Sequence, residues 1–196
     1  MISVVEPAKK RDLTTLATVK DELGIGDRAS DAQLRRQITQ ASDAIAKYCR
    51  RVFPIETVSE VFRIGQTGTL MLSRYPVTEV VSVIVDGKPI TEPSYWLDRD
   101  TGIMDRCDGQ GRSVHWCGNV VVTYRAGYAL PAGLPEGIER ACIILVKSYS
   151  LGAERDPLIR SDAIEGAGST EYFSGGGTGL PPEVQGLLDP HIKPNG

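Results

Sequence analysis

The feature that most constrains the fold is a long amphipathic helix pattern in the first quarter of the chain. Its apolar residues recur at spacings of three and four, which places them on one helix face over about four turns. They are Leu34, Ile38, Ala41, Ile45 and Tyr48. Ser30 and Gln33 have the spacing of a capping box and predict the start of the helix. Pro54 prevents the helix from continuing.

Residues 56–130 have a different hydrophobic pattern. Val80–Val85 is rich in β-branched residues and leads into Asp86-Gly87, a strong signal for a two-residue hairpin because both turn positions need φ > 0. Apolar runs between glycines and aspartates predict further strands at 95–97, 102–104 and 120–124. These residues predict a small antiparallel β subdomain of about four to six strands.

Two further helices are predicted on either side of these elements. Residues 13–26 have an apolar face, with Thr14 or Thr15 as the N-cap and Gly24 or Gly26 at the end. Another helix begins at Pro135 and ends near Gly152. Its apolar residues are Ile138, Ala141, Cys142, Leu145 and Tyr149.

This order predicts an α+β fold with a small helical core of three or more helices, an inserted antiparallel β subdomain and an extended C-terminal tail. We divide the chain into N-terminal helices of the core (1–55), the β subdomain (56–130), a core helix (131–152) and a C-terminal arm (153–196).

The C-terminal arm is polar and rich in glycine, and a short helix is predicted from Pro181 to Leu188. Because the arm has few large apolar groups, burying them offsets little of the conformational entropy lost when the arm becomes ordered. The arm therefore either stays mobile or is ordered by another chain. Its candidate anchors are Tyr172, Phe173, Leu180, Val184, Leu187 and Leu188. The alternative is that the arm packs back on its own domain.

Charge and composition argue against several functions. The chain has 22 basic and 25 acidic residues among 196, a net charge of −3, which argues against binding DNA, RNA or an anionic membrane through bulk charge. No apolar run approaches the ~18 residues of a membrane span. Residues 1–13 lack the apolar core of a signal peptide. We therefore expect an intracellular soluble protein with no membrane partner.

The sequence predicts no catalytic, cofactor or metal site. It contains neither a nucleophile elbow nor a phosphate-binding loop. Cys107, His115 and Cys117 form the only cluster that suggests a metal, and zinc would need a fourth ligand and tighter spacing. The aspartates between residues 98 and 105 do not have the spacing of a calcium loop. We expect no enzymatic activity and no cofactor.

Several stretches read together carry a family resemblance. They are 13–25, 31–53, 75–77, 80–87, 95–98, 101–103, 124–128, 134–135, 155–157, 160–164 and 180–184. In this order and spacing they resemble the head–tail connector proteins, also called head-completion or adaptor proteins, of tailed bacteriophages and gene transfer agents. The resemblance covers nearly the whole chain.

The resemblance implies a structural virion protein. Such proteins form a ring, typically of twelve subunits, beneath the portal of a filled capsid, and the ring extends the DNA channel toward a downstream head-closure or tail protein. The implied location is the neck of the virion, with the host cytoplasm during assembly. The C-terminal segment of the family reaches into the portal, which makes the six arm residues named above portal-contact candidates.

The near-neutral charge fits a conduit that DNA passes without specific binding, because tight binding comes from neutralising phosphates with Lys and Arg. The alternative function is a non-ring binding module of phage morphogenesis, such as a tail terminator or a head-closure factor. A stable monomer with its arm folded on itself would favour that alternative.

Overall fold

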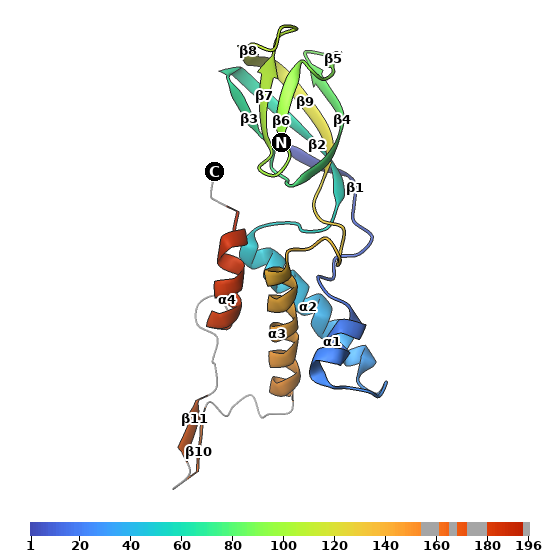
Figure 1. The fold of residues 1–196 in the computed structure, drawn as a ribbon, viewed down its shortest axis with the longest axis vertical. Coiled ribbons are helices and arrows are strands. Elements are labelled where there is room, and N and C mark those ends of the chain that lie inside the picture. Colours follow the sequence, from blue (N-terminus) through green and yellow to red (C-terminus); the bar gives the residue numbers. More distant parts are fainter. Residues whose placement is uncertain (154–160, 165–167, 172–179, 194–196) are drawn as a thin grey trace. The chain divides into compact units, whose positions relative to one another are not determined.

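The computed structural model describes residues 1–153, 161–164, 168–171 and 180–193 (Figure 1). The chain divides into two compact units. The β unit comprises residues 1–10 and 52–129, and the helical unit comprises residues 11–51 and 130–196. The β sequence therefore interrupts the helical sequence, and the α+β class predicted from the sequence is confirmed.

A five-stranded antiparallel sheet forms one wall of the β unit, in the order β1-β2-β9-β4-β5. The strands are β1 (Ile2–Glu6), β2 (Glu56–Thr67), β4 (Val77–Val85), β5 (Lys88–Ile90) and β9 (Trp116–Ala126). The longest pairing joins β2 to β9, from Glu56 opposite Ala126 to Thr67 opposite Trp116. This pairing fixes which residues of the two strands face the core.

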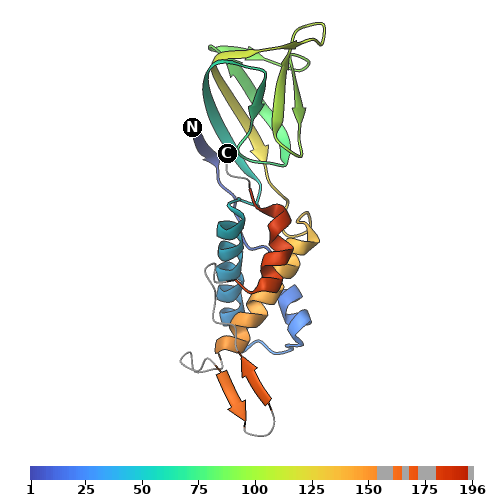
Figure 2. The same cartoon turned by 90° about the vertical axis from the view of Figure 1, so that its left-hand side faces the viewer.

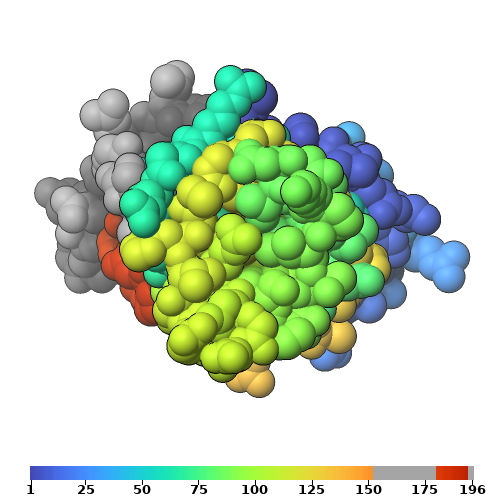
Figure 3. Space-filling model, turned by 90° about the horizontal axis from the view of Figure 1, so that it is seen from above, coloured from blue at the N-terminus to red at the C-terminus, as the bar shows by residue number. Residues whose placement is uncertain are grey.

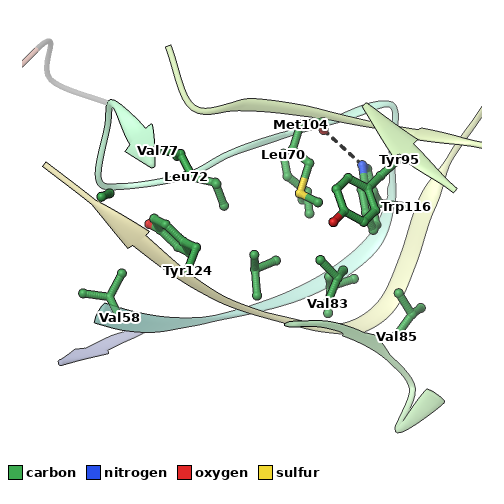
Figure 4. Packing of buried hydrophobic residues seen from close by; sticks show 13 residues of the cluster. Val58, Leu70, Leu72, Val77, Val83, Val85, Tyr95, Met104, Trp116 and Tyr124 are labelled. Atoms are coloured by element: carbon green, nitrogen blue, oxygen red, sulfur yellow. Dashed lines mark hydrogen bonds between the residues drawn. The ribbon is translucent and has the colours of Figure 1, made fainter. Parts of the chain in front are cut away.

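A second antiparallel sheet covers the inner face of the first. It consists of β3 (Thr69–Met71), β6 (Tyr95–Asp98), β7 (Ile103–Cys107) and β8 (Ser113–Val114), with β7 pairing with each of the others. Apolar side chains from both sheets fill the space between them (Figure 4). Trp116 is fully buried there, and its indole N–H donates a hydrogen bond to the carbonyl oxygen of Met104 at 3.1 Å.

The hairpin predicted at Asp86-Gly87 is confirmed, with φ values of 47° and 79° between β4 and β5. Residues 56–126 contain eight strands, β2 to β9, rather than about four to six. The additional strands are short, and short strands carry little periodicity. Residues 2–6, which the sequence analysis placed with the N-terminal helices, form strand β1 and pair with β2.

A carboxylate is buried at one end of the β core. Glu60, only 4% exposed, accepts hydrogen bonds from the Tyr124 hydroxyl at 2.8 Å and from the backbone N–H of Ser73 at 2.9 Å. The Ser73 hydroxyl also donates to it. Burial, and secondarily the nearby Glu60 charge, raises the pKa of Tyr124, so this phenol remains a donor. The network joins β2 and β9 to the turn before β4.

The helical unit contains α1 (Leu16–Leu23), α2 (Asp31–Cys49), α3 (Glu136–Ala153), α4 (Pro182–Leu188) and a 3-10 turn at Asp189–His191. Two strands, β10 (Ser161–Ile164) and β11 (Gly168–Glu171), pair with each other. Helix α3 contacts both α2 and α4, and Figures 1 and 2 show the three side by side. The predicted apolar stripe of α2 is buried from Leu34 to Ile45, whereas Tyr48 is half-buried.

The helix ends agree only partly with the sequence predictions. Thr15 caps α1 by accepting a hydrogen bond from the backbone N–H of Thr18 at 3.1 Å, and Gly24 ends the helix with φ of 66°. The capping box predicted at Ser30 is wrong, because the Ser30 side chain makes no capping bond. Asp31 at the first helical position instead pairs with Lys20 at 2.7 Å. Helix α3 continues past Gly152 to Ala153.

Candidate assembly surfaces

The structure places four of the six predicted portal-contact residues. Leu180, Val184 and Leu188 are at most 3% exposed, and Leu187 is half-buried. Leu180, Val184 and Leu188 are spaced four residues apart, and within α4 this spacing puts Val184 and Leu188 on one helix face. Helix α4 packs on α3 and α2. Tyr172 and Phe173 lie outside the described residues.

Hydrogen bonds connect the segment after α4 to the end of α2. The Tyr48 hydroxyl donates to the Asp189 carboxylate at 2.7 Å, and the backbone N–H of Lys193 donates to the carbonyl of Cys49 at 2.9 Å. Residues 180–193 are therefore part of the helical unit. In this segment the arm packs back on its own domain, the alternative named in the sequence analysis, because α3 and α2 provide a surface that the sequence alone did not reveal.

Titratable groups at this junction are held in their neutral forms. The hydrogen bond to Asp189 raises the pKa of Tyr48. Burial raises the pKa of the Cys49 thiol to about 11. Burial, and secondarily the Arg51 guanidinium, lowers the pKa of His191. The Tyr48 phenol and the Cys49 thiol therefore stay protonated at neutral pH.

Strand β1 is an exposed edge of the five-stranded sheet. All five of its residues are exposed, and the apolar side chains of Ile2, Val4 and Val5 are 38%, 48% and 60% accessible. Among the described strands, only β2 pairs with it. Dark blue atoms of the N-terminal residues lie at the surface in Figure 3. Sequence analysis missed this surface, although the run Ile2–Val5 is rich in β-branched residues.

A groove of about 570 Å³ lies along β4 in the same unit. Its walls come from β4 and from the chain between β5 and β6. Lining residues include Glu79, Val80, Val81, Ile90, Glu92, Tyr95 and Arg99. The lining mixes apolar and polar residues, three of them charged, and an extended peptide can lie along such a groove.

The structure shows what surrounds three residues that were considered for metal binding, Cys107, Cys117 and Asp98. Cys107 is half-buried and Cys117 exposed, both as free thiols. Over the described ranges, no three His, Cys, Asp or Glu side chains are grouped to hold a metal ion. Asp98 accepts hydrogen bonds from the backbone N–H groups of Asp100 and Thr101, and its hydrogen bonds to this turn lower its pKa. In the part of the chain that is described, no helix has the length and apolarity to cross a membrane.

Comparison with solved structures identifies relatives of the whole fold. A chain from the neck of an empty GTA particle, computed with C6 symmetry, has a TM-score of 0.62 and 19% identity. Chains from the virion of a native gene transfer agent particle and from a native GTA neck with C12 symmetry have TM-scores of 0.61 and 0.58, each at 17% identity. In all three, the match covers 100% of this chain and 96% of the other.

Comparison with protein families gives the identity of the chain. A search of curated protein sequences found no match. The family model described as head completion protein, by contrast, matches residues 12–193, which confirms the resemblance found in the sequence. This is a family of structural virion proteins, not of enzymes. Because the match spans almost the entire sequence, the chain belongs to the head completion protein family.

Proposed function

We propose that this protein is a structural connector in the neck of a virion or a gene transfer agent particle, where it joins the filled head to the tail. The observation that carries the proposal is the family match over residues 12–193. Similarity in fold to chains of GTA necks, over 96% of their length, supports the same role.

The proposal includes a ring of twelve copies beneath the portal, through which packaged DNA passes. The solved necks computed with C6 and C12 symmetry support this stoichiometry, because twelve copies are compatible with either symmetry. The net charge of −3 supports a channel that does not bind DNA tightly. A downstream head-closure or tail protein is the expected partner at the far side of the ring.

Portal contact by the C-terminal arm (153–196) is the next part of the proposal. In the described conformation, Leu180, Val184 and Leu188 anchor the arm to the helical unit. They would contact a portal only if α4 separated from α3. Tyr172 and Phe173 remain predicted portal contacts, and alanine substitution of this pair tests them without removing a described core residue.

The test is particle assembly in cells that lack this protein. We expect electron micrographs to show DNA-containing heads without tails and free tails beside them, because the joint between the two is missing. Supplying the protein in trans restores tailed particles. Normal tailed particles in its absence would overturn the proposal.

A further inference from the structure

We propose that neighbouring copies of this protein pair through their β units, with β1 of one copy adding to the open edge of β4 in the next. This inference rests on the proposed ring and names the surfaces that close it. A ring built by head-to-tail contacts needs two different, complementary surfaces on every copy. The β unit supplies both of them.

The first surface is β1, an edge strand without the usual protection against pairing. Proteins protect exposed edges with lysine, proline or very short strands. At the other end of the sheet, β5 has three residues and contains Lys88 and Pro89, so that edge is protected. Strand β1 contains neither residue type, and its three apolar side chains are exposed.

The second surface is the part of β4 that β5 leaves open. Strand β5 pairs only with Val83–Val85. Arg99 covers the start of this edge, because its carbonyl accepts from the Val77 N–H at 2.6 Å and its guanidinium donates to the Thr78 carbonyl at 3.0 Å. No described strand covers this side of residues 79–82. The groove described above runs along this stretch. In β-strand addition, the backbone of an added strand pairs with an open edge, and alternate side chains enter pockets beside it.

The two surfaces are similar in length and match in direction. Strand β1 has five residues, and the open stretch of β4, residues 79–82, has four. Successive antiparallel pairings from β1 through β2 and β9 to β4 make β1 run opposite to β4. Rotation about an axis along the strands preserves their direction, so β1 of one copy meets β4 of the next in antiparallel orientation.

The side chains also match. Ile2 and Val4 lie opposite Glu60 and Val58 of β2, two core residues, so they point to the core face of the sheet. When β1 extends the neighbour's sheet beside β4, the Ile2 and Val4 side chains contact Val80 and Tyr95 of the neighbour in the groove. Pairing irregularities on either side of Thr78 and Val81 limit the backbone ladder, so these side-chain contacts supply much of the interface.

The first test counts copies bound to purified portal rings of the same particle. We expect Val4→Lys with Val5→Lys, and separately Val81→Lys, to reduce ring occupancy at least tenfold, because lysine on an edge opposes pairing. The matched control is Met71→Lys, at an apolar side chain on the second sheet that is 70% exposed. Normal rings from the β1 variants would overturn the inference.

Cross-linking gives a second test that uses conservative changes. Ser3 and Ser82 lie opposite Ser59 and Thr123, two residues of the outer sheet face whose hydroxyls contact each other at 3.4 Å. With Ser3→Cys and Ser82→Cys in a Cys117→Ser background, a short thiol cross-linker should give a ladder of covalent oligomers from portal-bound rings. Either cysteine alone should give none.

The two proposals fail in distinguishable ways. If the unchanged protein forms no ring on the portal, the proposed function fails. If it forms rings but the double-cysteine protein gives no ladder, the β1–β4 pairing is wrong and the proposed function stands.

Discussion

The two units of the chain differ in how many separate stretches of the sequence build their cores. Residues 52–129 supply nearly all of the β unit as one uninterrupted stretch, whereas the helical unit needs two stretches, 11–51 and 130–196. Hydrogen bonds between the two helical stretches include Thr14 to Glu139 at 3.0 Å and Ser150 to Gln37 at 2.8 Å. The helical unit can therefore close only after the β sequence has been synthesised.

The cores differ in chemistry as well. The β core is built around Trp116, Tyr124 and a buried carboxylate, Glu60. The fully buried side chains of α2, α3 and α4 are mostly aliphatic, with Cys49 and Cys142 as small apolar residues. We infer that the stability of the β unit depends on specific aromatic and polar contacts. The stability of the helical unit depends on apolar helix faces that come from both sides of the inserted β sequence.

The largest expected effect is a loss of stability confined to the β unit. Trp116→Ala should destabilise the β unit by about 3–5 kcal/mol, since it removes a fully buried aromatic side chain. Urea unfolding followed by amide NMR signals from each unit measures this. Trp96→Ala, at a side chain 56% exposed, is the control and should change stability by less than about 0.5 kcal/mol. Equal losses in both units would contradict the division.

Leu188→Ala is the corresponding test of the helical unit. We expect a loss of about 2–5 kcal/mol in the helical unit alone, because the side chain is fully buried in α4. Hydrogen exchange of α4 amides measures the release of this helix. The neighbouring Leu187→Ala, at a half-buried position, should cost less. If both variants were equivalent, α4 would not be docked as described.

Tyr124→Phe tests the polar part of the β core. It removes the hydroxyl that donates to Glu60 and accepts from the backbone N–H of Arg74 at 3.2 Å. The expected cost is about 1–3 kcal/mol, because the buried Glu60 carboxylate and the part-buried Arg74 N–H each lose a partner. Thermal unfolding of the β unit measures it, and an unchanged melting temperature would show that the network adds no stability.

Two caps of the helical unit give a matched pair with a smaller effect. Thr15→Ala should cost about 1 kcal/mol, since its hydroxyl caps α1. Ser30→Ala should cost less than about 0.5 kcal/mol, because the Ser30 side chain makes no capping bond to α2. Chemical denaturation of the two variants compares them directly. A larger loss for Ser30→Ala would restore the capping box predicted from sequence.

The smallest expected effect concerns pH and His191. Its pKa is lowered in the folded state, so the unfolded chain binds the proton more readily. This contribution to stability is complete above the ordinary pKa of about 6.5 and is lost as pH falls through the folded value. The protection of α4 amides from hydrogen exchange, taken relative to the intrinsic exchange rate at each pH, should therefore fall on acidification in the unchanged protein and less so in His191→Gln. Identical pH profiles would exclude a role for this group.

Local sequence signals predicted the elements whose cause is local. Asp86-Gly87 specifies its hairpin through backbone conformation, and the stripe from Leu34 to Ile45 specifies a helix face. Strand β1 was missed because its pairing partner, β2, lies more than fifty residues away and a five-residue strand carries a weak pattern. The spacing of Leu180, Val184 and Leu188 was visible, but the surface that buries them comes from distant helices.

The assembly surfaces were even harder to predict from the sequence. The groove along β4 exists because β5 is short and the chain then continues to β6, a geometry that no motif encodes. Family resemblance supplied the connector role, because the order and spacing of many weak elements is distinctive when no single one is.

Native mass spectrometry of the protein with and without the portal ring of its own particle tests the central claim most directly. The connector account predicts a complex of one portal ring with twelve copies of this chain, whether the copies assemble beforehand or only on the portal. A monomer or dimer that ignores the portal at micromolar concentrations would contradict it.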